Sequence, residues 1–237
     1  MKILVTGATG FIGSALIDYF SSKSNCVVVG MVRTIKDLSS YVGVEFRLGE
    51  IGSLKKMEFD LSDIDVIIHT AGLAHIVNDE PVNSFGDFHR VNTSGTLELA
   101  KLAVDAGVKR FIFLSSIKVN GESTELGAPF SIKSIENPQD AYGRSKHEAE
   151  IGLRNISNEA GLEVTIIRPP LVYGSGVRGH FSIMVKALSW RVPMPFASIK
   201  NNRRSMVGLD NLLSLIALCV MHPKAANQTF LISDNDS

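Results

Sequence analysis

Tyr142 and Lys146 stand four residues apart in the stretch Tyr142-Gly143-Arg144-Ser145-Lys146. On a helix this spacing puts both side chains on one face, with Cβ atoms roughly 5–6 Å apart. A free phenol has a pKa of about 10, and a nearby ammonium favours the phenolate and lowers that pKa. A tyrosine held this way can act as acid and base between a hydroxyl and a ketone. The alternative is an ordinary Tyr and Lys on a surface helix.

A glycine-rich turn near the start of the chain indicates what accompanies this pair. Gly7, Gly10 and Gly13 follow the apolar run 3–6 and open a stretch with helical periodicity. In a dinucleotide-binding turn the first glycine permits the tight turn, the second admits the pyrophosphate and the third lets the helix pack closely. The phosphates then face the free N–H groups of the helix N-terminus. We therefore expect a dinucleotide site formed by Gly7, Thr9, Gly10, Phe11, Ile12 and Gly13. Its oxidised nicotinamide would lower the pKa of Tyr142 further. A glycine-rich turn without a ligand is the alternative.

The rest of the chain supplies elements that position such a site. Short apolar runs alternate with longer helix-period stretches, which predicts a Rossmann-type, doubly wound parallel α/β sheet. Strands are expected over 3–6, 26–32, 44–48, 65–70, 110–115, 163–168 and 229–233, and helices over 11–22, 85–106 and 141–160. Prolines and glycines interrupt the chain after Arg168. We therefore predict a Rossmann domain over 1–168 and a small, irregular substrate lobe over 169–237.

Composition excludes several classes of protein. Hydrophobic residues make up 45% of the 237, which indicates a globular domain rather than a disordered chain. Lys and Arg together number 24, as do Asp and Glu, so no basic field exists for nucleic acid or an anionic membrane. Cys26 and Cys219 lie in apolar runs, which favours reduced thiols. With no signal peptide expected and an apolar run at 212–221 too short to cross a bilayer, we predict a cytoplasmic protein.

Two further kinds of chemistry are not expected. The six histidines show no metal-ligand spacing and no Cys/His cluster exists, so we predict no metal site. No Gly-x-Ser-x-Gly elbow is present, which disfavours a Ser–His–Asp hydrolase.

The glycine spacing Gly-x-x-Gly-x-x-Gly, together with the Tyr142–Lys146 motif, resembles the extended short-chain dehydrogenase/reductase family over essentially the whole chain. Within it the chain is most similar to the NAD-dependent epimerase/dehydratase group, which includes nucleotide-sugar epimerases, dehydratases and 4-ketoreductases. The resemblance implies that Lys146 hydrogen-bonds the nicotinamide ribose. It also implies a homodimer built from the helices 85–106 and 141–160, with Ala149 and Leu153 expected to be exposed at the interface.

The segment 114–121 resembles the family's segment that bears the catalytic serine. On this match Ser116 hydrogen-bonds the reacting sugar oxygen, and Ser115 is the alternative. Two strand-end hydroxyls that satisfy loop backbone would explain the same residues without catalysis. Dehydratases carry an Asp-Glu pair directly after this serine, whereas Ile117 and Lys118 stand there in this chain. Dehydration is therefore not expected.

The resemblance assigns the remaining positions less specifically. Several are expected beside the cofactor: Thr70, Ala71 and Gly72 as a backbone wall, Glu50 and Ile51 near the adenine although the family more often has Asp there, Asn92 as support, and Ser115 and Pro169. Arg204 resembles an arginine that binds the nucleotide diphosphate, and a surface basic cluster with Arg203 is the alternative.

The end of the second predicted strand bears on the choice of cofactor. An acidic residue there would bind the adenosine ribose and repel a 2′-phosphate. Val32 occupies that position and Arg33 follows it. Since arginine forms charge-assisted bonds to phosphate, NADP is moderately favoured over NAD. A solvated strand-end arginine is the alternative.

Together these residues predict an enzyme that moves a hydride reversibly at C4 of a UDP-linked sugar, either a 4-epimerase or a 4-ketoreductase. Ser116, Tyr142 and Arg204 would bind the substrate. The alternatives are a dinucleotide-binding sensor or scaffold without turnover, and a reductase of a small non-nucleotide carbonyl. The family usually continues well past a strand such as 229–233, so part of the sugar-nucleotide pocket is expected beyond residue 237.

Overall fold

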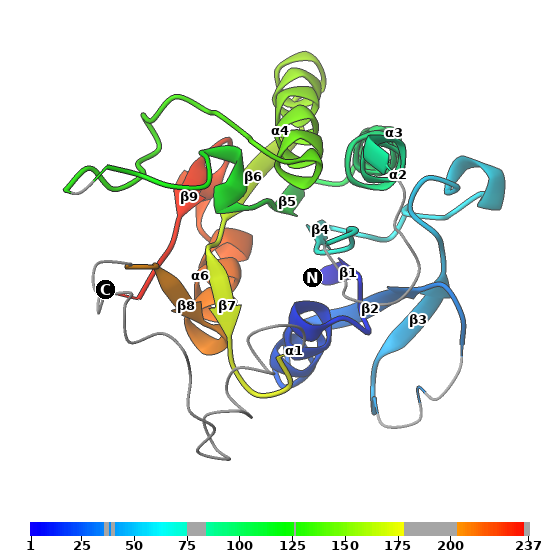
Figure 1. Ribbon diagram of the computed structural model, residues 1–237. Helices are drawn as coiled ribbons and strands as arrows, with labels where there is room; N and C mark the ends of the chain where they lie inside the picture. Colours follow the sequence, from blue (N-terminus) through cyan, green and yellow to red (C-terminus); the bar gives the residue numbers. More distant parts are fainter. Residues whose placement is uncertain (36–37, 39–40, 75–83, 126, 178–202, 235–237) are drawn as a thin grey trace.

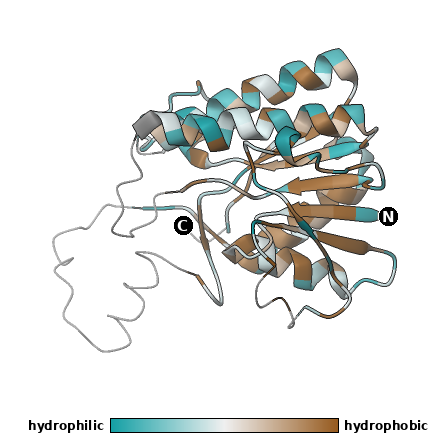
Figure 2. Cartoon of the chain, turned by 90° about the vertical axis from the view of Figure 1, so that its right-hand side faces the viewer, coloured by the Kyte–Doolittle hydropathy of each residue, from teal (hydrophilic) through white to brown (hydrophobic). Residues whose placement is uncertain are grey.

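The computed structural model has three layers, with a parallel β-sheet between two layers of helices (Figures 1 and 2). It describes the chain apart from residues 36–37, 39–40, 75–83, 126, 178–202 and 235–237. The strands form the hydrophobic middle layer, and hydrophilic residues gather on the outer sides of the helices (Figure 2). This arrangement confirms the predicted Rossmann-type α/β fold.

The sheet has seven parallel strands in the order β3-β2-β1-β4-β5-β6-β9. Their bounds are β1 Lys2–Thr6, β2 Val27–Val32, β3 Glu45–Leu48, β4 Val66–His69, β5 Arg110–Leu114, β6 Glu163–Arg168 and β9 Thr229–Leu231. All seven strands predicted from the sequence are present, with ends that differ by at most two residues. The strand order reverses beside β1, whose neighbours are β2 and β4. In such sheets a ligand binds at this reversal, at the carboxyl ends of the strands.

Different helices cover the two faces of the sheet. On one face lie α1 (Phe11–Ser21) and α6 (Leu209–Met221), and on the other lie α2 (Ser84–Phe88), α3 (Thr96–Asp105) and α4 (Ala141–Ala160) (Figure 1). The helix predicted over 85–106 is interrupted by a π-helical segment, η2 (His89–Gly95). Such wide turns occur most often at functional sites.

Helix α4 has the predicted bounds because both of its ends are capped. The Asp140 side chain accepts a hydrogen bond from the Gly143 N–H at 2.6 Å, and Gly161 ends the helix with φ +75°. A carboxylate N-cap satisfies one of the free amides of the first turn, and glycine adopts the left-handed conformation without a Cβ clash.

Side chains that alternate along each strand fill two separate cores. Leu4 and Phe111 face the α3 and α4 side, whereas Ile3 and Ile112 face the α1 and α6 side. The homodimer prediction used Ala149 and Leu153 as exposed interface positions, and this is wrong because both are fully buried in the core beneath α4. Their helical spacing from the other apolar residues of α4 puts them on the inward face.

The segment after residue 169 is more regular than predicted. It contains a small parallel pair, β7 (Leu171–Tyr173) and β8 (Met206–Gly208), followed by α6 and β9, which return to the main sheet. Short 3₁₀ turns complete the described elements at η1 (Lys55–Met57), η3 (Ile117–Val119) and η4 (Pro223–Ala225). The division at residue 169 stays a prediction, and residues 178–202 and 235–237 of the expected lobe lie outside the described residues.

Within the described part of the chain, no helix is both long and apolar enough to cross a membrane. The same residues contain no group of three or more His, Cys, Asp or Glu side chains arranged to hold a metal ion. Cys26 and Cys219 are free thiols.

Candidate active site

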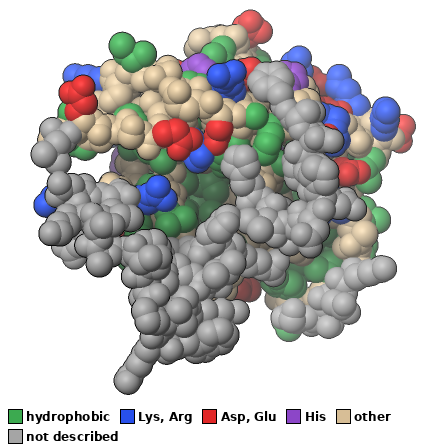
Figure 3. Space-filling view, in the orientation of Figure 1, with side chains coloured by type: hydrophobic (Ala, Val, Ile, Leu, Met, Phe, Trp, Pro, Cys, Tyr) green, Lys and Arg blue, Asp and Glu red, His purple; other side chains and the backbone are tan. Residues whose placement is uncertain are grey.

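The residues predicted to do chemistry gather where β1, β4, β5 and β6 end. Figure 3 shows a hollow in the face of Figure 1, with hydrophobic side chains at its floor and charged side chains around it. The glycine turn follows β1, the segment Thr70–Gly72 follows β4, and Ser115 and Ser116 follow β5. Because parallel strands end at the same edge, residues far apart in the sequence meet there.

The turn after β1 accepts only glycine at two of its three positions. Gly7 has φ +68°, and a Cβ on Gly13 would lie 2.0 Å from the Gly7 carbonyl oxygen. The Gly10 N–H donates to the same carbonyl at 2.8 Å, which closes the turn. Helix α1 then begins with no side-chain cap and no acidic residue in its first turn. Its free N–H groups and partial positive charge therefore remain available to a phosphate, and the turn fits a dinucleotide.

Lys146 lies on α4 with its ammonium buried below the end of β5. Its side chain is 3% exposed, Nζ donates to the Leu114 carbonyl at 2.9 Å, and Nζ lies 4.6 Å from the Phe113 ring centroid. Burial lowers the pKa of Lys146 to about 8, and the negative charge of Glu150 acts in the opposite direction. Most Lys146 side chains therefore stay protonated at neutral pH.

Tyr142 hydrogen-bonds the Ser116 side chain, which joins two of the three residues predicted to contact the substrate. Burial raises the pKa of Tyr142, and the Ser116 hydrogen bond opposes this. Asp140 raises the pKa further, while Lys118 is the cation that lowers it. The expectation that the Lys146 ammonium lowers this pKa is not met in the chain alone, because desolvation has the largest effect and the cation that opposes it is Lys118.

The two serines have different partners. Ser116 is the N-cap of η3, and its Oγ accepts from the Lys118 N–H at 3.2 Å. Ser115 turns the other way and donates to Glu150 Oε1 at 2.5 Å. Of the two, Ser116 is the serine whose side chain meets Tyr142.

Asn92 connects the segment after β4 with helix α4. Asn92 lies in the π-helical segment and is fully buried. Its Oδ1 accepts from the Leu73 N–H at 2.8 Å, and its Nδ2 donates to the Leu73 carbonyl and to Ser145 Oγ, both at 3.0 Å. A Cβ on Gly72 would lie 3.0 Å from Asn92 Oδ1 and 3.3 Å from Lys146 Nζ. The predicted wall, the predicted supporting residue and the lysine are thus in close contact.

The sequence analysis missed a buried ionic cluster behind Ser115. Glu150 and Arg168 are 0% and 1% exposed. Arg168 Nε donates to Glu150 Oε1 at 2.9 Å, and its two Nη groups reach Glu150, Glu136 and the Asn120 Oδ1 atom. Two features of the sequence could have indicated this cluster. Glu150 stands four residues after Lys146 on one helix face, and Arg168 ends a predicted strand.

His69 was also missed. It ends β4, is fully buried, and hydrogen-bonds Thr6 and Thr96. A single histidine in an apolar strand carries no pattern that distinguishes a connecting role from simple packing.

Other predicted residues are not drawn into this group. Arg33, Glu50 and Arg204 are exposed, and Ile51 packs in the core against Gly95. At the turn itself, Thr9 and Gly10 are exposed, whereas Phe11 and Ile12 are half-buried. Pro169 is buried, and its carbonyl accepts from the Ile117 N–H at 3.0 Å, which ties β6 to the segment after Ser116.

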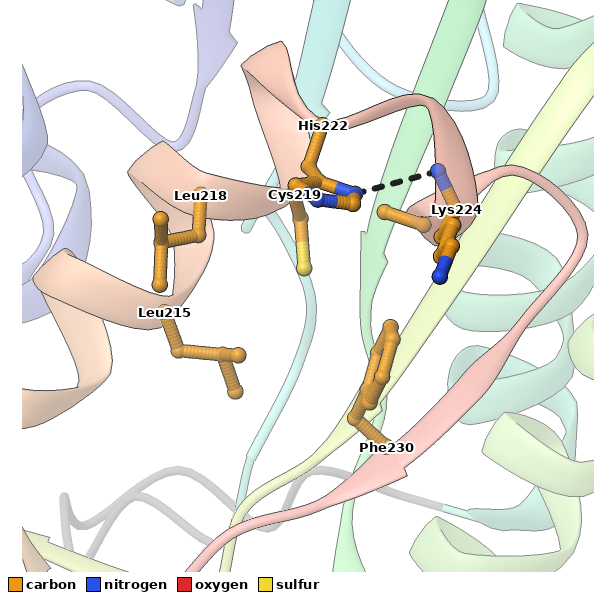
Figure 4. Close-up of a pocket in the computed structure, with 7 residues that line it drawn as sticks. Leu215, Leu218, Cys219, His222, Lys224 and Phe230 are labelled. Carbon is orange, nitrogen blue, oxygen red and sulfur yellow. Dashed lines mark hydrogen bonds between the residues drawn. The ribbon is translucent and has the colours of Figure 1, made fainter.

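A separate apolar pocket lies between the end of α6 and β9 (Figure 4). Its volume is about 270 Å³, and Cys219, His222 and Phe230 are among the residues that line it. Figure 4 shows the His222 ring accepting a hydrogen bond from the Lys224 backbone N–H, at 3.1 Å. None of the predicted site residues lines this pocket, so it is not the candidate active site.

A glycine turn at the reversal of a Rossmann-type sheet, with Ser, Tyr and Lys at the same edge, defines a dinucleotide-dependent enzyme of the short-chain dehydrogenase/reductase class. A sequence model of the NAD dependent epimerase/dehydratase family matches residues 3–233. The chain belongs to this family, as the resemblance of its motifs predicted.

Individual relatives point to epimerases. The chain is 44% identical over 233 residues to a UDP-glucose 4-epimerase from Vibrio cholerae. The matched region covers 98% of this chain and 70% of that relative. A solved UDP-glucose 4-epimerase with UDP-glucose, from Thermotoga maritima, superposes with a TM-score of 0.83 at 26% identity, covering 98% of this chain and 77% of that one. A UDP-glucuronic acid 4-epimerase from Bacillus cereus in complex with NAD has the same fold, with a TM-score of 0.83 at 24% identity over 100% of this chain and 79% of the other.

Proposed function

We propose that the protein is a nucleotide-sugar 4-epimerase that acts on a UDP-linked sugar by reversible hydride transfer at C4. The observation that carries this proposal is the hydrogen bond between Ser116 and Tyr142, together with the buried ammonium of Lys146 on the same helix as Tyr142. The 44% identity to a UDP-glucose 4-epimerase supports the choice of reaction and of nucleotide. Ile117 and Lys118 follow Ser116, so no carboxylate stands directly after it to eliminate water.

Residues of this chain would hold the dinucleotide along one edge of the sheet. The N–H groups at the start of α1 bind the pyrophosphate, the segment Thr70–Gly72 forms the wall, and Lys146 bonds the nicotinamide ribose. The nicotinamide, when bound, would supply the acceptor and donor of the hydride exchanged with C4 of the sugar. Asn92 holds the wall through Leu73, so this part of the site is formed by the chain itself.

The chain's own groups move the proton. Ser116 hydrogen-bonds the C4 oxygen of the sugar. Tyr142 removes the proton of this C4 hydroxyl while the hydrogen on C4 leaves as a hydride. The raised pKa of Tyr142 means that the phenol keeps its proton until positive charge is added beside it. Lys146 is protonated at neutral pH, since its pKa is about 8, and the oxidised nicotinamide would supply the additional positive charge. The same tyrosine returns the proton to the C4 oxygen after the 4-keto sugar has rotated in the site.

A 4-ketoreductase is the second candidate, and the residues after β2 favour it. Val32 is 5% exposed, no acidic residue stands at this strand end, and Arg33 is exposed and able to meet a 2′-phosphate. NADP would then be the preferred cofactor, because a net reductase commonly uses the phosphorylated donor. Further parts of the proposal rest on the sequence: Arg204 as a diphosphate ligand, a homodimer, and a cytoplasmic location.

Incubation with UDP-glucose, UDP-galactose and UDP-4-keto sugars separates the candidates. Product identity by NMR and absorbance of the reduced cofactor are followed together. An epimerase interconverts the two UDP-sugars with no net change in reduced cofactor. Net consumption of NADPH with a 4-keto sugar would identify a ketoreductase. Dinucleotide binding without any turnover would indicate a sensor or scaffold instead.

A further inference from the structure

His69 lies at the centre of a chain of buried hydrogen bonds behind the candidate site. Its Nδ1 lies 2.7 Å from Thr6 Oγ1, and its Nε2 lies 2.9 Å from Thr96 Oγ1. All three side chains are fully buried. The imidazole therefore joins the end of β1 to the start of α3 across the end of β4.

The partners of the two threonines fix the direction of every bond. Thr96 Oγ1 lies 2.7 Å from the Asn92 carbonyl, which only accepts, so the one threonine proton is used there. Nε2 must then donate to Thr96, and Nδ1 accepts from the Thr6 hydroxyl. Thr6 Oγ1 in turn accepts from the Ala71 N–H at 3.1 Å. With the opposite tautomer the Thr6 proton would have no acceptor among these groups.

The ring is neutral in this position. Burial lowers the pKa of His69 to about 3, and the nearby charge of Lys146 lowers it in the same direction. A neutral ring with one donor and one acceptor nitrogen is what the two threonines require.

At one end, the chain of bonds reaches the dinucleotide turn. Thr6 directly precedes Gly7, and its carbonyl accepts from Thr70 Oγ1 at 2.7 Å. A Cβ on Gly7 would lie 2.9 Å from the Ala71 nitrogen, so the turn sits directly on the segment after β4.

At the other end, the bonds reach the first turn of α4. The Asn92 side chain donates to Ser145 Oγ at 3.0 Å, and Ser145 Oγ donates to the Tyr142 carbonyl at 2.8 Å. Thr93 adds a bond from its Oγ1 to the Ser145 carbonyl at 2.9 Å. The backbone that carries Tyr142 is thus connected to the backbone that precedes Gly7.

We propose that His69 is a positioning residue that couples the dinucleotide turn to the helix that carries Tyr142. Hydrogen bonds are directional, and a buried polar group left without a partner is costly, so the two ends keep one relative position. The inference rests on the proposed function, because it requires the turn to bind a dinucleotide and Tyr142 to react.

The first test is the tautomer. NMR of protein labelled with ¹⁵N-histidine distinguishes the Nε2–H ring, the Nδ1–H ring and the imidazolium. We expect one neutral Nε2–H signal that changes in Thr96→Val, which assigns it to His69. An imidazolium or an Nδ1–H ring at this position would overturn the proposal, whether or not the protein is an epimerase.

The second test measures the coupling across the chain of bonds. Thr→Val keeps the shape of the side chain and removes the hydroxyl, whereas Thr→Ser keeps the hydroxyl. We expect Thr96→Val to weaken NAD binding at the distant turn, and Thr6→Val to lower kcat at saturating NAD. Each cross effect should be about tenfold, the size of one buried hydrogen bond. Thr96→Ser and Thr6→Ser should restore wild-type values.

Thr165→Val is the matched control. Thr165 is equally buried and donates to the Ala225 carbonyl at 2.7 Å, outside this chain of bonds. It should lower the stability of the fold and leave NAD affinity and kcat unchanged. If Thr165→Val has the same effects as the test variants, or if each test variant affects only its own end, the coupling is refuted. If the wild type binds NAD but shows no epimerase turnover, the proposed function is wrong. The effect of Thr96→Val on NAD affinity still tests the coupling in that case.

Discussion

Removing one partner of the Glu150–Arg168 pair should destabilise the protein far more than removing both. Both side chains are essentially inaccessible to solvent, and Arg168 Nε and Nη2 bond the two oxygens of Glu150. Breaking a buried pair leaves an uncompensated buried charge, which costs about 3–5 kcal/mol. Glu136 also bonds Arg168, so we expect Glu150→Leu to lie at the lower end of this range and Arg168→Met, which removes the buried guanidinium from both carboxylates, at the upper end.

The magnitude also follows from the partners that remain. Arg154 pairs with Glu150 at 2.9 Å but is 39% exposed, and such a pair is worth about 0–1 kcal/mol. Arg154→Gln is therefore the matched control. Replacing both buried charges with apolar residues of similar size is often neutral or even stabilising. The double variant Glu150→Leu/Arg168→Met should thus recover most of the stability that the single variants lose.

Urea unfolding of the wild type, the two single variants, the double variant and Arg154→Gln measures these differences. We expect an interaction free energy of about 2–3 kcal/mol between the two buried sites. The reasoning is refuted if the two single losses simply add in the double variant, or if Arg154→Gln costs as much as Glu150→Leu. The same variants show whether the cluster positions the active site, because Ser115 bonds Glu150 and directly precedes Ser116.

Four further predictions concern the site and the assembly. Tyr142→Phe should keep dinucleotide affinity and lower turnover about 10²–10⁴-fold, since it deletes only the acid–base hydroxyl, and near-normal turnover would exclude the assignment. Lys146 has a pKa of about 8 when folded and 10.5 as an ordinary solvated lysine, so the unfolded chain binds more protons between these values and stability should rise with pH there. Lys146→Met should lose that rise in urea titrations at several pH values, and an unchanged profile would contradict the shift. Arg33→Ala should erase a preference for NADP of roughly 10- to 150-fold with little change in NAD affinity, and a wild type that binds NAD at least as tightly would reduce Arg33 to a solvated side chain. Light scattering should give a homodimer that Ile151→Asp disrupts, because Ile151 is exposed on α4, and a monomer at all concentrations would refute it.

Local sequence signals predicted the sheet well. Most of the strands are short apolar runs, and helix α4 is capped by Asp140 and Gly161, residue types that can be recognised as caps in the sequence. Helix α6 was missed because its residues are apolar on most sides and follow a segment rich in glycine and proline. The π-helical segment was missed for another reason, since the wide turn around Asn92 does not alter the apolar periodicity.

The sequence by itself determined which residues are proposed to carry the chemistry. The glycine spacing, Ser116, and the four-residue separation of Tyr142 and Lys146 are local patterns, and each follows from the backbone geometry of one turn or one helix. Only the tertiary structure decided how these residues act on one another. Burial raises the pKa of Tyr142 although Lys118 opposes it, and Glu150, Arg168 and His69 are buried behind the proposed site. Burial and hydrogen bonding depend on contacts such as Glu150–Arg168, His69–Thr96 and Thr6–His69, which join elements 18, 27 and 63 residues apart in the sequence, and no local pattern encodes them.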